Sequence, residues 1–148
     1  RVGPVVRLQG RAIPGMTVLV DTSVWSLALR RDQESDAPQV RALRTALEGG
    51  EIVATTGLVL QELLQGFAGP RARKDIIERF SALPLLSPDR QDHIEAAELR
   101  NRCRRAGVQV GTIDALIAQL CIRHDVALLT TDNDFVQAAS HSPLRLWK

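Results

Sequence analysis

The stretch TVLVDTSVW, residues 17–25, decides the expected architecture of this 148-residue chain. Thr17 to Val20 is a continuous apolar run, which predicts a strand buried on both faces. Asp21 follows at once, and Thr22 to Arg30 predicts a helix because apolar residues recur there at helical spacing. A buried strand that runs directly into a helix is typical of a parallel sheet covered by helices.

The rest of the chain repeats this alternation of short apolar strands and amphipathic helices. Further strands are expected at Ile52–Thr55, Pro84–Leu86, Val126–Thr130 and Leu144–Trp147. Further helices are expected at Ala37–Leu47, Leu58–Phe67, Ala72–Leu83, Arg90–Arg105, Ile113–His124 and Asn133–Ala139. The pattern predicts one α/β domain with a central, mainly parallel sheet of about five strands.

The composition narrows the class of protein. Hydrophobic residues make up 45% and charged residues 24%, as in ordinary globular domains. No apolar run approaches the ~20 residues that span a bilayer, and no signal peptide appears, so we expect no membrane association. Cys103 and Cys121 fit no metal-ligand spacing and predict reduced thiols in a cytoplasmic protein. Aromatic residues make up 3% of the chain, which argues against RNA binding by extensive base stacking.

Residues 1–15, RVGPVVRLQGRAIPG, have no helical or strand periodicity and precede the sole methionine, Met16. We interpret them as an appended or misassigned leader before a domain at 16–148, with a functional arm as the alternative. The net charge of +2 comes from 19 basic and 17 acidic residues, and the leader holds three arginines and no acid. Without the leader, 16 basic residues face 17 acidic ones, so the domain itself is not basic.

Several acids stand in apolar surroundings. Asp21 and Asp132 each follow a predicted strand, where a parallel sheet forms its usual ligand crevice. Glu62 is the one acid on an apolar helix, and Asp114 opens another helix, with Thr112 as its expected N-cap. Each acid alone has an ordinary explanation, since helix capping suits the aspartates and a solvent-facing stripe suits the glutamate.

Together the four acids favour a metal site. All of them are expected at the carboxyl ends of the strands, where unpaired carboxylates would repel and raise one another's pKa. A hard divalent cation removes that penalty. An oxygen-only set of ligands suits Mg²⁺, with Mn²⁺ as a substitute, rather than zinc.

The motifs that contain these acids resemble those of a known family. VDTSVW at 20–25, QELLQG at 61–66, GTIDALIA at 111–118 and LLTTDNDF at 128–135 are similar, in order, to the four acidic motifs of PIN-domain nucleases, above all the VapC-type toxins. The resemblance covers Met16 to Lys148 and implies a three-layer α/β/α fold. It implies a catalytic metal site of Asp21, Glu62, Asp114 and Asp132, with Thr22, Ser23, Thr112 and Asp134 as supporting residues.

The resemblance also implies an activity. It is that of a Mg²⁺-dependent endoribonuclease, the toxin of a bacterial toxin–antitoxin pair, which leaves 3′-hydroxyl and 5′-phosphate ends. The substrate would be tRNA or ribosomal RNA, and the partners a cognate antitoxin and a second copy of the chain in a homodimer. For RNA contact we single out four basic residues before the third motif, Arg100, Arg102, Arg104 and Arg105. Cations at a helix C-terminus also complement the helix dipole, which is the alternative explanation.

Two other function classes remain open. Receiver domains and haloacid-dehalogenase-type phosphatases also place an aspartate after the first strand, but they need a late lysine near the phosphate. The two lysines here are Lys74, in a mid-chain helix, and Lys148, at the terminus. A non-catalytic module that receives a basic partner in its acidic pocket is the other class, and metal-dependent RNA cleavage distinguishes it from a nuclease.

Overall fold

A computed structural model describes residues 17–30 and 35–147. The leader at 1–15, and the interpretation given to it, lie outside the described residues. The elements are β1 (Thr17–Val20), α1 (Thr22–Leu29), α2 (Pro38–Glu48), β2 (Ile52–Thr56), α3 (Gly57–Gly66), α4 (Pro70–Phe80), β3 (Leu85–Leu86), α5 (Arg90–Arg105), α6 (Thr112–His124), β4 (Ala127–Leu129) and α7 (Asn133–Ala139).

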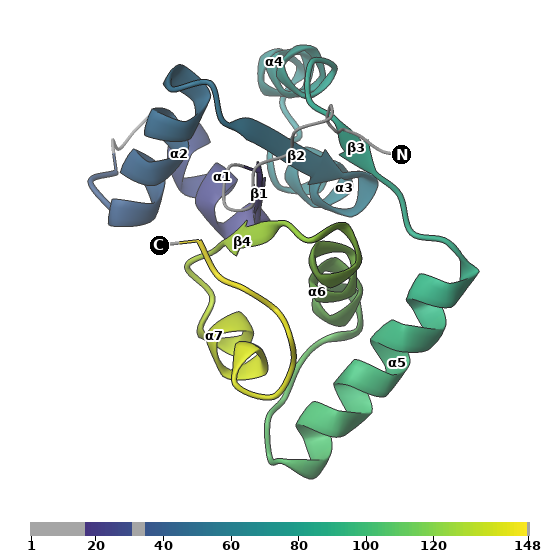
Figure 1. Ribbon diagram of the computed structural model, residues 1–148. Helices are drawn as coiled ribbons and strands as arrows, with labels where there is room; N and C mark the ends of the chain where they lie inside the picture. The colour runs from purple at the N-terminus through teal and green to yellow at the C-terminus, as the bar shows by residue number, and fades with distance from the viewer. Residues whose placement is uncertain (1–16, 31–34, 148) are drawn as a thin grey trace.

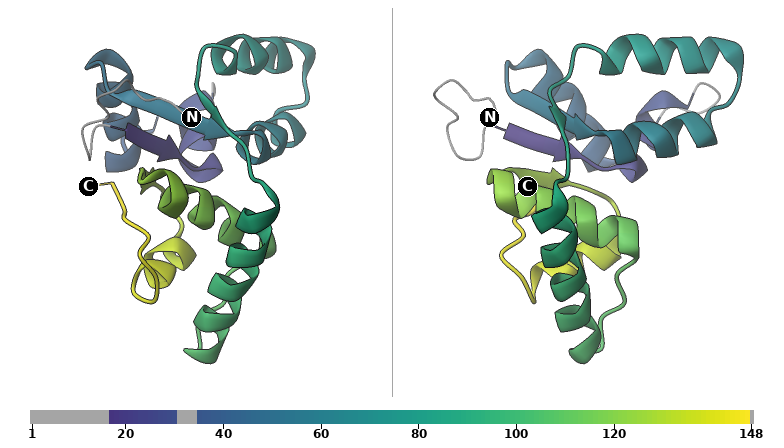
Figure 2. Two further views of the ribbon diagram at one scale, coloured as in Figure 1. Left: turned by 45° about the vertical axis from the view of Figure 1, so that its right-hand side comes forward. Right: turned by 90° about the vertical axis from the view of Figure 1, so that its right-hand side faces the viewer.

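The four strands form one parallel sheet in the order β3-β2-β1-β4 (Figure 1). β1 is central, and its residues Val18, Leu19 and Val20 are fully buried, as the continuous apolar run predicts. A parallel sheet needs cover on both faces, and the helices supply it as two layers, α1–α4 and α5–α7 (Figure 2). The expected three-layer α/β/α fold is confirmed.

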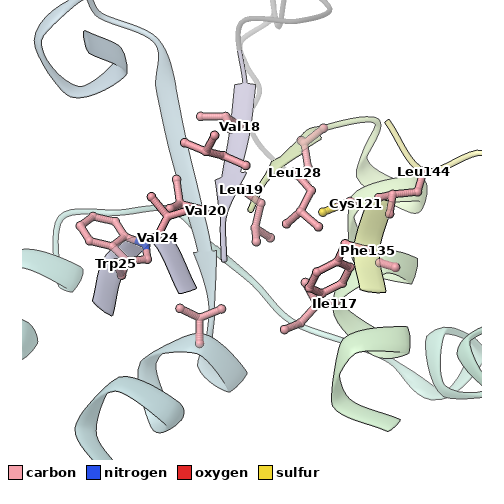
Figure 3. Close-up of a cluster of buried hydrophobic side chains, with 14 of the residues drawn as sticks. Val18, Leu19, Val20, Val24, Trp25, Ile117, Cys121, Leu128, Phe135 and Leu144 are labelled. Carbon is pink, nitrogen blue, oxygen red and sulfur yellow. The ribbon is translucent and has the colours of Figure 1, made fainter. Parts of the chain in front are cut away.

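The two faces of β1 build two halves of one core (Figure 3). On one face Val20 lies beside Val24 and Trp25 of α1, and Trp25 packs on Phe80 of α4 with ring centroids 4.9 Å apart. On the other face Leu19 and Leu128 point toward Ile117 and Cys121 of α6 and Phe135 of α7. Both cysteines are buried and free.

The fifth strand, expected at Leu144–Trp147, is reduced to a single parallel bridge between Leu128 and Leu146. Leu128 donates its backbone N–H to Arg145 and accepts from Trp147, at 2.9 and 2.8 Å. β4 has only three residues, so it offers this segment little length to pair with. α4 begins at Pro70, because the fixed φ of proline suits the first helical position, and it ends at Phe80 rather than at the expected Leu83.

Candidate metal and RNA-cleavage site

Asp21 lies at the carboxyl end of β1, where its backbone N–H still bonds to the carbonyl of Leu129 on β4 at 2.9 Å. It occupies the N-cap position of α1, but its side chain makes no capping hydrogen bond. The carboxylate is 5% exposed, and its Oδ2 accepts hydrogen bonds from the hydroxyls of Ser23 at 2.7 Å and Thr130 at 2.9 Å. Helix capping therefore does not account for this buried carboxylate.

Thr130 is a site residue that the sequence analysis missed. Its hydroxyl donates to Asp21 Oδ2 and accepts from the backbone N–H of Asp132 at 2.9 Å. Ser23 makes the parallel connection, because its hydroxyl accepts from the backbone N–H of Thr131 at 3.1 Å. The two hydroxyls thus join the ends of β1 and β4. The sequence signal that could have identified Thr130 is its position directly after β4, the strand that pairs with β1.

Glu62 lies in the second turn of α3, half-buried. Thr56, the last residue of β2, caps α3 by accepting from the backbone N–H of Val59 at 3.1 Å, so the helix starts at the carboxyl edge of the sheet. Thr22 donates its hydroxyl to Glu62 Oε1 at 2.6 Å. Glu62 is therefore held toward the end of β1 and does not lie on a purely solvent-facing stripe.

Asp114 lies in the first turn of α6. The N-cap of α6 is Gly111 rather than Thr112, which is the first residue of the helix and is exposed. The expectation that Thr112 caps this helix is wrong: the chain takes the extended N-cap conformation one residue earlier, and no side chain makes a capping bond. In Figure 2 (right), α6 begins on the side of the sheet toward which β1 points.

The electrostatics of Asp114 show that the acids share one region. Its pKa is raised to about 6, first by burial and then by the negative charges of Asp21, Asp132, Glu62 and Asp134. The residues that the sequence analysis chose from four separate motifs are therefore brought within electrostatic reach of one another.

Asp132 and Asp134 begin α7. Asp132 caps this helix, since its Oδ1 accepts from the backbone N–H of Asp134 at 2.9 Å, so capping explains part of its role. Asp132 is half-buried and Asp134 exposed. The family motif also contains Phe135, which is fully buried and packs in the core, as expected for a packing residue.

The arginines chosen for RNA contact differ in their surroundings. Arg100 donates its Nε to the carbonyl of Val110 at 2.8 Å, so it fastens the loop that leads to α6. Arg102, Arg104 and Arg105 are exposed in the last turn of α5, where they complement the helix dipole.

The chemistry of the candidate ligands fits a hard divalent cation, because all of them are carboxylates and none is a histidine or cysteine. Among residues 17–30 and 35–147, however, no three acids, histidines or cysteines stand close enough together to form a ready-made metal cage. Burial and then the neighbouring carboxylates raise the pKa of Asp114, and a bound cation would relieve the repulsion among these carboxylates.

Asp114 gives a prediction for pH. Its folded-state pKa lies above the unfolded value, so the metal-free fold loses stability as pH rises from about 4 through about 6. Asp114→Asn should therefore raise the melting temperature in EDTA at pH 7.5 by a few degrees, roughly 1 kcal/mol after solvent screening, and by nothing at pH 4.

Melting curves at both pH values measure this, with Glu98→Gln, an exposed acid on α5, as the control. An Asp114→Asn variant that melts below the wild type at pH 7.5 would contradict the repulsion.

Comparison with known proteins places the chain in a family. The model of the PIN domain matches residues 18–140. The chain is 32% identical over 120 residues to ribonuclease VapC11 of Mycobacterium tuberculosis, covering 80% of this chain and 88% of that protein. This chain belongs to the PIN-domain family, in its VapC-type ribonuclease branch.

Solved structures agree with the PIN fold. VapBC2 from Rickettsia felis, bound to a DNA fragment from its promoter, matches with a TM-score of 0.67 at 19% identity, covering 88% of this chain and 96% of that one. VapC20 of Mycobacterium tuberculosis, a toxin that cleaves the sarcin–ricin loop, matches with a TM-score of 0.61 at 22% identity, covering 86% and 98%. No helix within residues 17–30 and 35–147 is long and apolar enough to cross a membrane.

Proposed function

We propose that this PIN domain is a Mg²⁺-dependent endoribonuclease that acts as the toxin of a toxin–antitoxin pair. The observation that carries the proposal is the placement of acids from four motifs near the carboxyl edge of the sheet: Thr22 holds Glu62 toward the end of β1, and burial, followed by the charges of Asp21, Asp132, Glu62 and Asp134, raises the pKa of Asp114. Acids that repel one another at the carboxyl edge of a parallel sheet are suited to binding a cation rather than to supporting the fold.

Asp21 and Asp114 are the residues we assign as direct metal ligands. Oδ2 of Asp21 already accepts two hydroxyl donors, so its Oδ1, which accepts no hydrogen bond from another described residue, is the atom available to a cation. Glu62 and Asp132 would complete the site, directly, through water, or by holding a second ion.

A divalent cation bound there supplies Lewis acidity to a phosphodiester oxygen and lowers the pKa of water. The carboxylates hold and orient it, and the low exposure of Asp21 limits competition by solvent. Hydrolysis by this route leaves a 3′-hydroxyl and a 5′-phosphate, as the family resemblance implies.

The substrate class and partners follow from the relatives. VapC11 is a ribonuclease, and VapC20 is a toxin that cleaves the sarcin–ricin loop. We propose a structured stable RNA, tRNA or ribosomal RNA, as the target. A cognate antitoxin is proposed as the neutralising partner, since several solved neighbours are VapBC complexes, and a homodimer as the form of the free toxin.

Cleavage of tRNA and ribosomal RNA by the purified chain with Mg²⁺, with Mn²⁺, and with EDTA tests the activity, and sequencing of RNA 5′ ends after induced expression tests the target. We expect one discrete cut in a stable RNA, dependent on added metal and suppressed by the cognate antitoxin. Cleavage that persists in EDTA would exclude the metal mechanism, and no cut in any RNA would overturn the nuclease assignment.

Thr130 gives a second prediction, as a positioning residue for Asp21 and Asp132. Thr130→Val keeps the shape of the side chain but removes the hydrogen bonds of the hydroxyl with Asp21 and Asp132, so Mn²⁺ affinity and the cleavage rate should fall roughly 10- to 100-fold. Thr130→Ser should restore most of both, because it keeps the hydroxyl.

Isothermal titration of Mn²⁺ and cleavage rates measure the effect. Thr131→Val is the matched control, since the exposed Thr131 contributes its backbone N–H to Ser23 but no side-chain hydrogen bond to another described residue. Equal behaviour of the two valine variants would remove Thr130 from the site.

A further inference from the structure

α4 carries a group of basic side chains that the site description has not used. Arg71, Arg73 and Lys74 follow Pro70 in the first two turns of the helix, and all three are exposed. None of their side chains forms a hydrogen bond or ion pair with another residue in the described part of the chain. We call these three residues the α4 basic cluster.

The helix dipole does not explain the α4 basic cluster. The amino end of a helix carries partial positive charge, which favours acids there, and the first turn of α4 contains none. α5 has Asp92 in its first turn and Arg102, Arg104 and Arg105 in its last, with Arg90 as its first residue. The dipole therefore accounts for the last-turn arginines of α5, whereas the basic side chains at the amino end of α4 oppose it.

The position of α4 relates the cluster to the acidic site. α3 starts at the carboxyl end of β2, carries Glu62, and leads through residues 67–69 into α4. In Figure 2 (right), the corner between α3 and α4 projects beyond the ends of the strands, on the side to which the arrows point. The connecting chain limits the distance between the Cα atoms of Glu62 and Arg71 to roughly 20 Å.

A polyanionic substrate meets an electrostatic difficulty at this site. The carboxylates that raise the pKa of Asp114 also repel phosphates, so cations outside the acidic centre must supply the attraction that brings RNA to it. In Figure 1, α5 lies in the helical layer below the sheet and α4 in the layer above it, so basic side chains on α4 would attract RNA from the opposite face of the sheet.

We propose that Arg71, Arg73 and Lys74 bind phosphates of the RNA flanking the cleavage position, and that α4 is part of the RNA-binding surface. The inference rests on the proposed ribonuclease function and names the surface that recognises its substrate. Arginine and lysine without protein partners contact phosphates independently of sequence, so this surface supplies affinity and orientation rather than sequence specificity.

RNA binding as a function of salt tests the proposal. A fluorescein-labelled single-stranded RNA and bulk tRNA are titrated in EDTA with the Asp21→Asn protein, so that no cleavage interferes. Adding Arg71→Gln and Arg73→Gln should lower the slope of log K against log salt by about 1.4 for the single strand, and weaken binding roughly 25-fold at ~0.1 M salt.

The matched control is the pair Arg41→Gln and Arg44→Gln on α2, the helix that leads into the amino end of β2. It removes the same charge and should leave the slope within error, and melting curves verify that both doubles are folded. Equal slopes in the α4 and α2 doubles would overturn the proposal, as would loss of antitoxin binding in the α4 double with unchanged RNA binding.

Cleavage by the wild-type protein is scored separately. RNA cleavage together with an unchanged slope refutes the α4 surface and leaves the nuclease assignment intact. A reduced slope in a protein that cleaves no RNA supports the surface and refutes the nuclease.

Discussion

Asp21→Asn is expected to reduce metal-dependent RNA cleavage by at least ~10³-fold while the protein stays folded. The substitution keeps the volume of the side chain and a carbonyl oxygen that can still accept from Ser23 and Thr130. It removes one of the charges that repel Asp114 and with it an anionic ligand of the proposed metal site. Single-turnover cleavage with saturating Mg²⁺ measures the loss.

Two further measurements separate a chemical defect from a structural one. The melting temperature in EDTA should equal or exceed that of the wild type, because the substitution relieves repulsion, and affinity for RNA in EDTA should not decrease. Asp36→Asn, an exposed acid before α2, is the control and should cleave at the wild-type rate. Metal-dependent cleavage near the wild-type rate by Asp21→Asn would refute the site.

Much of the fold was predictable because the local signals agree with the tertiary ones. Val18 to Val20, directly before Asp21, have no polar side chain to place at a surface, so a central parallel strand accommodates them. Asn133–Ala139 follows an aspartate that caps it, and both of its boundaries were predicted as observed. The closing strand at Leu144–Trp147 was predicted but is only a single bridge. Its pairing depends on the length of the neighbouring strand β4, which cannot be inferred from the sequence of the segment itself.

The candidate site, like the fold, could be predicted from the sequence only in part. Its acids could be chosen because each stands in an apolar or strand-terminal context, and the raised pKa of Asp114 now shows that they interact. The hydrogen bond from the Thr130 hydroxyl to Asp21 could not be predicted. The two residues are 109 positions apart, and their contact follows from the register between β1 and β4. Val20 pairs with Leu129 in that register, which makes the next residue on each strand a neighbour.

The second large effect is expected at Asp92, a fully buried acid that lies outside the site. It completes a capping box with Asp89 and accepts from Arg123 of α6 in two bonds, to Oδ1 and Oδ2, both at 2.7 Å. Asp92→Ala leaves the backbone N–H of Asp89 and the guanidinium of Arg123 without this partner. We expect a loss of about 3 kcal/mol, or roughly 6–12 °C in melting temperature.

The pH dependence of this loss has a defined sign. Burial alone would raise the pKa of Asp92, but the hydrogen bonds from Arg123, the backbone of Asp89 and Gln119 outweigh it, so the pKa is lowered. A lowered folded-state pKa stabilises the protein above pH ~4 and loses that effect as pH falls. The difference in stability between wild type and Asp92→Ala should therefore be full at pH 7 and shrink on acidification below pH ~4.

Asp92 also shows that stability and catalysis are separable in this fold. Its partner Arg123 stands near the end of α6 and Asp114 near the start, nine residues apart on a continuous helix. Below its melting transition, Asp92→Ala should thus cleave RNA within a few-fold of the wild-type rate, whereas Asp21→Asn should melt normally and not cleave. Glu98→Ala is the control for charge, because Glu98 is an exposed acid on α5, the helix of Asp92. This substitution should change neither stability nor cleavage. A cleavage defect in Asp92→Ala as deep as that of Asp21→Asn, at a temperature where the protein is folded, would contradict this separation and make the α5–α6 pair part of the site.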